Sequence, residues 1–232
     1  MSLDELWEHS ACPTSDKLGN FSKYVRRQDI ARFLCRYEIF KRQMGSKGSI
    51  VECGVHHGGG AMTWAQISAT LEPYNYHRKI IGFDTFRGFP AVAAQDGHSE
   101  NTRVGAFGEK YDVHEELCCA IAEFDSNRFI NNKQKVELVK GDANETIPRY
   151  LTQHPYLLVS LLYLDFDIYE PTLTALTNLL PRVPKGGIIA FDEVNNPDWP
   201  GETLALLEKL DLRRHRLECL EFEPNISFIQ LD

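Results

Sequence analysis

The sequence lacks any apolar run long enough to cross a lipid bilayer, which takes roughly 20 residues in a helix. The longest run, from Tyr156 to Asp165, is interrupted by Ser160. An excess of positive charge is missing as well, because 25 Lys and Arg face 33 Asp and Glu and the formal net charge is −8. A negative net charge disfavours contact with phosphate backbones and anionic lipids. We therefore expect no membrane and no nucleic acid among the partners.

Closely spaced cysteines are also scarce. The six cysteines contain no C-x-x-C spacing, and the only adjacent pair is Cys118-Cys119, so no disulfide-rich scaffold is predicted. We interpret all six as buried thiols in a reducing compartment. The first residues, Met1 to Glu8, are acidic and lack the basic start and apolar stretch of a secretory signal. Together these features predict a cytoplasmic protein, and they leave the oligomeric state open, including a homo-oligomer.

The composition is that of a globular domain, since 43% of the 232 residues are hydrophobic and 25% are charged. Short apolar runs, each followed closely by Gly or Asp, predict five β-strands: Ser49–Cys53, Lys79–Phe83, Lys135–Val139, Leu157–Leu164 and Gly187–Phe191. Stretches with helical periodicity lie between them: Ala61–Leu71, Glu115–Phe124, Glu145–Tyr150 and Thr172–Leu179. This alternation predicts a parallel sheet with helices on both faces.

The two ends of the chain depart from this alternation. From Tyr24 to Met44, residues recur at three- and four-residue steps, which predicts an amphipathic helix in a helical extension over residues 1–47. The positions that set this pattern are Ile30, Phe33, Leu34, Tyr37, Phe40 and Lys41. At the other end, Arg214–Phe222 and Ile226–Leu231 predict two antiparallel strands joined by a tight turn at Glu223-Pro224-Asn225. We predict one domain over residues 1–232, with its core in residues 48–232.

The segment Phe89–Asp112 interrupts the rhythm with glycine and polar residues. Uninterrupted loops of this length are uncommon inside compact domains and are often lids over active sites. We predict a lid that is mobile without ligand, because the segment lacks apolar residues to anchor it. The alternative is a surface excursion without a role.

Glycines follow the first predicted strand, in the stretch from Glu52 to Gly60. In open α/β sheets, ligands bind at the carboxyl ends of the strands, and glycine lets a ligand approach the backbone closely. The spacing Gly54-x-x-x-Gly58 differs from the dinucleotide pattern G-x-G-x-x-G. The loop therefore predicts a nucleotide-like cofactor, and the alternative is a turn that only packs.

Acids follow the next two strands. Asp84 comes after the second strand, where a carboxylate can accept hydrogen bonds from both hydroxyls of a ribose. Asp142, beside Ala143, comes after the third strand, where an adenine edge would lie. Each of these acids is also a typical turn or N-cap residue, so both interpretations stay open.

Acidic residues also end the fourth and fifth predicted strands, namely Asp165 on one and Asp192 with Glu193 on the other. Carboxylates held together repel one another unless a cation is present, and oxygen ligands without cysteine or clustered histidine select Mg²⁺, Mn²⁺ or Ca²⁺ over zinc. No Lys or Arg lies immediately beside Asp165 or Asp192 in the sequence to neutralise them. We predict a divalent metal site, and the alternative is that the acids cap helices or pair with basic residues such as Lys185.

Taken in order, these motifs resemble the TylF-like macrocin O-methyltransferases, over about residues 22–230. The resemblance is carried by Glu52-x-Gly54-x-x-x-Gly58-Gly59, Phe83-Asp84-Thr85-Phe86-x-Gly88-Phe89-Pro90, Leu164-Asp165-x-Asp167-x-Tyr169-x-x-Thr172, Gly186-Gly187 running to Asp192-Glu193, and Asp198-Trp199-Pro200-Gly201-Glu202-Thr203. The family consists of class I S-adenosylmethionine-dependent enzymes that methylate sugar hydroxyls, with a bound Mg²⁺. Two positions depart from its pattern: Glu193 stands where many relatives have Asp, and Phe166 where many have Gly.

The resemblance implies a Rossmann-like class I methyltransferase fold of the α/β class, with a seven-stranded, mostly parallel sheet and a C-terminal antiparallel hairpin. It implies S-adenosylmethionine and Mg²⁺ or Mn²⁺ as cofactors. The implied substrate is a deoxysugar that is nucleotide-linked or belongs to a glycosylated natural product or a surface polysaccharide. The implied cofactor contacts are Glu52, Gly54, Gly58, Gly59, Asp84, Asp142 and Ala143. The implied metal ligands are Asp165, Asp192 and Glu193.

The group that removes the sugar proton is less clearly indicated. His114 lies where the lid joins a helix, although Asp112 and Glu115 around it resemble a capping box, and metal-bound Asp165 is a competing acceptor. A rival enzyme class is a metal-dependent phosphohydrolase, because Asp165-Phe166-Asp167 resembles an aspartyl nucleophile followed by an acid two residues on. That motif normally follows the first strand, whereas here it follows the fourth. A third alternative is a non-catalytic protein that only binds the cofactor.

Overall fold

Seven strands form one sheet, in the order β3-β2-β1-β4-β5-β7-β6, in the computed structural model, which describes residues 2–232. The parallel strands are β1 (Ser49–Cys53), β2 (Ile80–Asp84), β3 (Val136–Lys140), β4 (Val159–Leu164) and β5 (Ile188–Phe191). β7 (Glu223–Gln230) runs antiparallel to β5, and β6 (Glu218–Leu220) runs antiparallel to β7. The predicted fold class, with a parallel sheet closed by an antiparallel hairpin, is confirmed.

The predicted turn of this hairpin is wrong. Glu223-Pro224-Asn225 begins β7, and the two-residue loop Glu221-Phe222 joins the strands, since Leu220 pairs with Glu223. Proline lacks a backbone N–H and is tolerated in a sheet chiefly at the start of a strand or at an edge. Pro224 is the second residue of β7, so it fits the strand.

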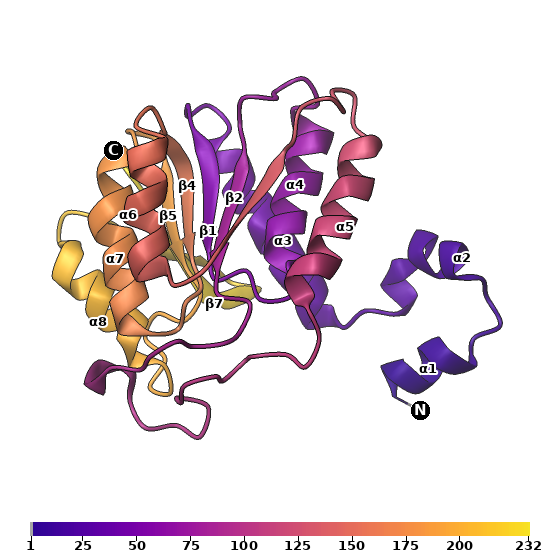
Figure 1. The fold of residues 1–232 in the computed structure, drawn as a ribbon, viewed down its shortest axis with the longest axis horizontal. Helices are drawn as coiled ribbons and strands as arrows, with labels where there is room; N and C mark the ends of the chain where they lie inside the picture. The colour runs from indigo at the N-terminus through magenta and orange to yellow at the C-terminus, as the bar shows by residue number, and fades with distance from the viewer. Residues whose placement is uncertain (1) are drawn as a thin grey trace.

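Helices cover both faces of the sheet (Figure 1). One face carries α3 (Arg27–Gln43), α4 (Gly59–Leu71) and α5 (Val113–Ser126), and the other carries α6 (Ala143–Gln153), α7 (Tyr169–Leu179) and α8 (Pro200–Lys209). β4 serves both cores, because Leu161 and Tyr163 face the first and Leu162 and Leu164 face the second. Short 3₁₀ helices lie at η2 (Ala94–Asp96) and η3 (Leu180–Arg182). The strand ends at one edge of this sheet position the site.

The N-terminal extension is helical, as predicted, but most of it stands apart. α1 (Leu3–His9), α2 (Thr14–Gly19) and η1 (Phe21–Lys23) project away from the sheet and its helices (Figure 1). α3 forms within three residues of its predicted start, yet its predicted inner face is largely wrong, since Phe33 and Leu34 are exposed. The face that packs on the sheet and α4 is the neighbouring stripe: Ala31, Cys35, Arg36, Ile39, Phe40 and Gln43.

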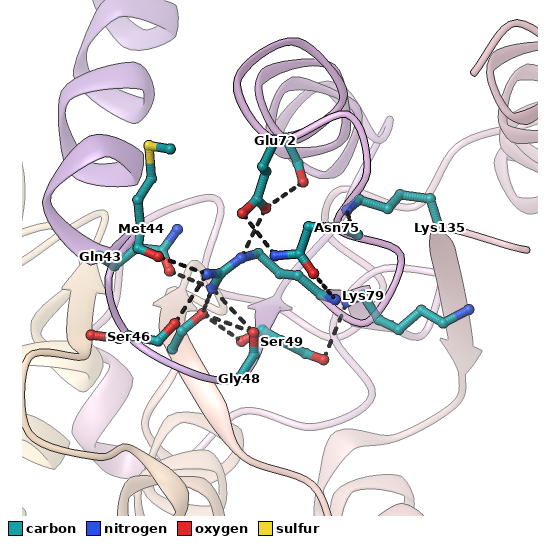
Figure 2. Close-up of polar contacts among 12 residues, drawn as sticks. Gln43, Met44, Ser46, Gly48, Ser49, Glu72, Asn75, Lys79 and Lys135 are labelled. Carbon is teal, nitrogen blue, oxygen red and sulfur yellow. Dashed lines mark hydrogen bonds and ion pairs between the residues drawn. The ribbon is translucent and has the colours of Figure 1, made fainter. Parts of the chain in front are cut away.

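Arg78 ties together the amino ends of the strands, opposite the site. Its buried guanidinium donates to the side chain of Gln43 at 2.6 Å and to the carbonyl oxygens of Gly48, Met44 and Ser46 at 3.1, 3.2 and 3.0 Å. It also donates to the Ser160 hydroxyl and lies 2.9 Å from a carboxylate oxygen of Glu72. Figure 2 shows these groups converging from the end of α3, the following loop and the end of α4.

The cysteines do not follow the prediction that all six are buried. Cys35 and Cys53 are buried in the core, whereas Cys12, Cys118, Cys119 and Cys219 are exposed, and all six thiols are free. The exposed ones lie on the N-terminal extension, on the outer side of α5 and on the edge strand β6, where no second layer covers them.

No helix in residues 2–232 is long and apolar enough to cross a membrane.

Candidate active site

The loop between β1 and α4 lies against the chain that leaves β4. Gly54 has a φ of +93°, and a Cβ on it would lie 1.9 Å from the carbonyl oxygen of Asp165. Gly58 has a φ of +86° and faces the side chain of Leu117. Both positions require glycine, because a side chain would be strained and would clash. Gly59, which begins α4, has open space beside its Cα.

Glu52 is buried beneath this loop. A Cβ on Gly60 would lie only 1.9 Å from the Oε1 atom of Glu52, so Gly60 leaves room for this carboxyl group. The Oε2 atom of Glu52 has no hydrogen-bond partner in the described chain. Burial raises the pKa of the Glu52 carboxyl to about 8, even though nearby Arg36 lowers it. Glu52 is therefore mostly neutral at pH 7.

Asp84 holds the glycine loop in place. One carboxylate oxygen accepts hydrogen bonds from the backbone N–H groups of Val55 and His56, at 2.7 and 2.8 Å, and the other accepts from that of Phe86 at 2.6 Å. A carboxylate offers about four lone-pair sites, so one remains for a ligand. Asp142 likewise has a local partner, since it caps α6 by accepting from the N–H of Asn144 at 2.9 Å.

A single cavity of about 720 Å³ joins the glycine loop to the ends of β4 and β5. Such a volume is within the range of small-molecule sites. The predicted site residues that line it are Glu52, Gly54, Gly59, Asp84, Asp142, Ala143, Asp165, Asp192 and Glu193. Gly58 and His114 are not among its lining residues.

An acid cluster, made of Asp165, Asp167, Asp192 and Glu193, lies in the cavity where β4 and β5 end, and several of its carboxyl groups have raised pKa values. Burial, together with the charges of Asp192 and Asp167, raises the pKa of Asp165 well above its usual value. Burial, with the charges of Asp192 and Glu193, raises the pKa of Asp167 to about 7. Asp167 also adopts a φ of +62°, an uncommon conformation for a residue other than glycine. Strained, buried and mutually repelling carboxylates in a cavity are typical of functional sites.

The three predicted metal ligands do not form a compact ligand set. Within residues 2–232, the potential ligands whose atoms all lie within 4.8 Å of one another are His56, His57 and Glu109, so the predicted acids do not meet this distance. One oxygen of Asp192 instead forms an ion pair with Arg32 and accepts from the Tyr163 hydroxyl at 2.5 Å. No basic residue lies beside Asp192 in the sequence, but Arg32 reaches it from α3, so Asp192 pairs with a basic residue as the alternative interpretation expects.

The macrocin O-methyltransferase (TylF) family matches residues 35–201, which is more than half of the chain. The chain belongs to this family. It is similar to the crystal structure of CalS11, a calicheamicin methyltransferase: the two are 34% identical with a TM-score of 0.95, over 98% of this chain and 89% of that one. A second structure, described as apo CalS11, TDP-rhamnose 3′-O-methyltransferase, is 32% identical with a TM-score of 0.85, over 98% of this chain and 91% of that one.

Curated members with related activities are more distant. A Streptomyces olivaceus 4′-O-methyltransferase of 8-demethyl-8-(2,3-dimethoxy-α-L-rhamnosyl)-tetracenomycin C is 28% identical over 64% of this chain and 54% of that protein. The Streptomyces niveus demethyldecarbamoylnovobiocin O-methyltransferase is 28% identical over 63% of this chain and 52% of that protein. The chain thus spans about half the length of the curated relatives it matches.

In this TylF-family chain, three charged site residues are missing from the sequence-based prediction. Arg32 and Arg36 lie one helical turn apart on α3, and both line the cavity. Arg36 is buried and donates to the Tyr163 hydroxyl at 3.4 Å. Glu202, fully buried on α8, accepts from the N–H of Glu193 at 3.1 Å, and its other oxygen has no partner in the described chain. The feature of the sequence that could have revealed them is a charged residue at a position of a helix that should face the core, because charged residues are rarely buried unless they are paired.

His114 does not reach the cavity. Its ring packs edge-on against Phe86, with the ring centroids 5.1 Å apart. Its helix α5 begins at Val113, and Asp112 caps it by accepting from the N–H of Glu115 at 3.1 Å. The expected cap is present, and His114 does not line the cavity, so a base role for His114 has no geometric support.

The predicted lid lies over the cavity and is anchored. Phe89 and Phe107 pack on each other and on Trp199, with ring centroids 5.4 to 6.0 Å apart. Asp96 is buried and accepts from the N–H of Tyr169 at 2.6 Å. The expectation that the segment lacks apolar anchors is wrong, because two of its aromatic residues meet a tryptophan that is distant in sequence.

The lid also touches the glycine loop. The Nε2 atom of His57 lies 3.2 Å from a carboxylate oxygen of Glu109, and its Nδ1 atom lies 2.9 Å from the Tyr111 hydroxyl. The ring of His56 meets that of His57 edge-on, with the centroids 4.1 Å apart, and burial together with the charge of His57 lowers the pKa of His56. These contacts connect the lid to the glycine loop, where the cofactor is predicted to bind.

Proposed function

We propose that this chain is an S-adenosylmethionine-dependent O-methyltransferase whose substrate is a deoxysugar, nucleotide-linked or part of a glycosylated natural product. The observation that carries the proposal is the cavity of about 720 Å³, because one continuous space is lined by both the glycine loop and the acid cluster and offers room for a cofactor and a sugar. Membership of the TylF family supports the reaction. The similarity to CalS11, a TDP-rhamnose 3′-O-methyltransferase, supports the class of sugar.

In this proposal, the glycine loop and the acids beside it bind S-adenosylmethionine. Gly54 and Gly59 let the cofactor approach the backbone, and Asp84 accepts one hydrogen bond from a ribose hydroxyl with its remaining lone pair. Asp142 and Ala143 lie beside the adenine ring of the cofactor. The bound cofactor supplies an electrophilic methyl group on its sulfonium sulfur.

The acid cluster receives the proton. During transfer the methyl carbon bonds to the sugar oxygen, its bond to sulfur breaks, and the hydroxyl proton moves to a carboxylate. Asp165 is the proposed acceptor, because it lines the cavity at the end of β4, directly beside the glycine loop. Holding the hydroxyl in line with the methyl group contributes up to about 7–11 kcal/mol in favourable cases.

A divalent cation, Mg²⁺ or Mn²⁺, belongs to the same proposal. Asp165, Asp192 and Glu193 would hold it, and it would lower the pKa of the sugar hydroxyl. The donors fit such an ion in their chemistry, because they are carboxylates that line one cavity and include a buried acid with a raised pKa. The ion has to compete with Arg32 for Asp192.

The test is a methylation assay on TDP-rhamnose and a panel of other nucleotide-linked deoxysugars, read by mass spectrometry. We expect a product heavier by one methyl group, activity lost with EDTA and restored by Mg²⁺, and a far lower kcat in Asp165→Asn with little change in cofactor affinity. Asp211→Asn, at an exposed position, is the control and keeps full activity.

Two further readouts separate the parts of the proposal. Calorimetric titration of Mg²⁺ into the protein, without substrate, shows binding to the native chain and not to Asp165→Asn if the cluster holds the ion. Full activity in excess EDTA would rule out the metal while leaving the methyltransferase intact. Cofactor binding without turnover across the panel, or phosphate release without cofactor, would contradict the proposed reaction.

A further inference from the structure

Two histidines of the glycine loop and one acid of the lid form a cluster that the proposed reaction does not use. His56 and His57 lie in the turn between β1 and α4, and Glu109 lies in the lid shortly before α5. One potential ligand atom from each lies within 4.8 Å of the other two, and no other group of His, Cys, Asp and Glu in residues 2–232 is this compact. All three side chains are exposed, so an ion can reach them from solvent.

The backbone at His56 brings the two imidazole rings together. In an extended chain, neighbouring side chains point to opposite faces. His56 instead has a φ of +49°, an uncommon conformation for a residue other than glycine. The centroids of its ring and that of His57 are consequently only 4.1 Å apart. The pair therefore offers two nitrogen ligands to one place beside the lid.

The distances and the types of ligand suit a zinc ion. Zinc binds imidazole nitrogen and carboxylate oxygen at about 2.0–2.2 Å in a tetrahedron, so two of its ligand atoms lie about 3.3 Å apart. The Nε2 atom of His57 and the Oε1 atom of Glu109 are 3.2 Å apart. His56 is at the surface, where a rotation of its side chain can bring its nitrogen to the same distance. Two histidines and one glutamate are a ligand set that zinc uses in proteins, with the fourth position open to water.

Tyr111 supports His57 in the orientation that a metal ligand needs. Its hydroxyl oxygen lies 2.9 Å from Nδ1 of His57, while Nε2 of the same ring faces Glu109. The ring nitrogen that does not bind the metal normally donates its N–H to a nearby oxygen, which fixes the tautomer. With the proton on Nδ1, the lone pair of Nε2 faces a carboxylate, and a cation between the two relieves their repulsion.

We propose that His56, His57 and Glu109 bind a Zn²⁺ ion that joins the lid to the glycine loop. Imidazole favours Zn²⁺, whereas Mg²⁺ prefers oxygen ligands, so this site differs in chemistry from the acid cluster. All three residues line the cavity, and the ion connects segments that lie about 50 residues apart in the sequence. The bound ion also slows exchange of the cofactor beneath the lid, a consequence that rests on the proposed function.

The first experiment titrates Zn²⁺ into the full-length protein in a calorimeter, with excess Mg²⁺ and without cofactor or sugar. We expect one tight site per chain. Binding should weaken by at least roughly a hundredfold in His56→Asn and in Glu109→Gln, and by about 10–100-fold in Tyr111→Phe, the usual loss when a hydrogen-bond partner behind a ligand is removed. Asparagine is chosen because it tolerates a positive φ. His98→Asn and Glu100→Gln, at exposed positions of the same lid, are the matched controls and should bind like the native chain.

Cobalt shows which atoms hold the ion. Co²⁺ enters nitrogen and oxygen sites of this kind with a similar geometry, and its absorption spectrum distinguishes these ligands from thiolates. We expect visible bands without the near-ultraviolet charge-transfer band of a thiolate, although four exposed cysteines are present. A thiolate band from the tight site would overturn the proposal. Equal Zn²⁺ affinity in the native chain, His56→Asn and Glu109→Gln would overturn it as well, because the cluster would then be an ion pair only.

Hydrogen exchange tests whether the ion joins the two segments. Zn²⁺ should slow exchange in the segment 89–112 and in the glycine loop of the native chain, but not in Glu109→Gln. Unchanged exchange in the native chain with zinc bound would overturn the bridge. Zinc binding should persist in Asp165→Asn, and its loss there would assign the ion to the acid cluster instead. None of these measurements needs methyl transfer, so this proposal and the proposed function fail separately.

Discussion

At the scale of single residues, the protein concentrates buried charge on the side of the sheet where the strands end. Arg36, Glu52, Asp165 and Glu202 are all buried or nearly so, and isolated buried charges are costly. Burial raises the pKa of each of the three acids above its usual value. Buried acids with raised pKa values lower the stability of the fold, and such groups are typical of functional sites.

Glu52 makes a pH-dependent prediction for stability. Its pKa is about 8 in the folded protein and 4.5 for an ordinary glutamate, so the folded state binds the proton more tightly. Its stabilising contribution is complete below pH 4.5 and is lost as pH rises through 8. Denaturant unfolding should therefore show Glu52→Gln gaining stability relative to the native chain from pH 5 to 8, with a plateau above. Glu123→Gln, at an exposed position, should show no such trend.

At the scale of elements, contacts between distant segments hold the amino ends of the strands and the lid in place. Arg78 joins the end of α3 to the amino ends of the strands (Figure 2), and the aromatic contact with Trp199 holds the lid. Both depend on residues that are far apart in the sequence. Each can be tested by one substitution.

Arg78→Met should lower the free energy of unfolding by about 3–5 kcal/mol, the usual cost of removing one partner from a buried charged network. The loss follows because Glu72 and the carbonyl oxygens of the α3 to β1 loop would lose their donor. Urea unfolding measures the change. Arg213→Met, whose side chain is 95% exposed, should stay within about 0.5 kcal/mol of the native chain. Equal stability of the two variants would show that the contacts of Arg78 do not stabilise the fold.

Trp199→Ala should release the lid. Without the indole, Phe89 and Phe107 lose a shared partner, so the segment 89–112 should open more often. Hydrogen exchange should become faster in this segment while the strands keep their protection, and bound cofactor and sugar should slow it again. Phe129→Ala, at an exposed site away from the cavity, serves as control. Unchanged exchange in the lid would show that the aromatic contact does not hold it.

At the scale of the whole molecule, cofactor binding should stabilise the fold. A ligand at a hundred times its Kd adds about 2.7 kcal/mol, which for a chain of this size raises Tm by roughly 5–10 °C. Asp84→Ala should weaken affinity roughly tenfold to a hundredfold, because a charged hydrogen bond contributes about 1.5–3 kcal/mol. Thermal shifts with S-adenosylmethionine measure this, with Asp211→Ala as control. An undiminished shift in Asp84→Ala would remove Asp84 from the cofactor site.

Much of the fold is predictable from local pattern. The five parallel strands appear within two residues of their expected starts, because each buried strand is a short apolar run followed by a turn residue. The C-terminal turn was less predictable, since Pro224 is a turn signal by itself and a strand residue only in the context of β5 and β7. The packing face of α3 was predicted wrongly, because packing partners and not periodicity decide which stripe of a helix is buried.

By itself, the sequence determined where the five parallel strands and the helices between them lie along the chain, the glycine loop and the acids at the strand ends, because these depend on residue type and short spacing. Only the tertiary structure decided what those acids face. Arg32 neutralises Asp192 across 160 residues of sequence, Asp84 accepts hydrogen bonds from the loop 28 and 29 residues before it, and His114 packs on Phe86 without lining the cavity. The physical reason is that charges and hydrogen bonds act over a few ångströms in space, and packing alone brings distant residues within that range.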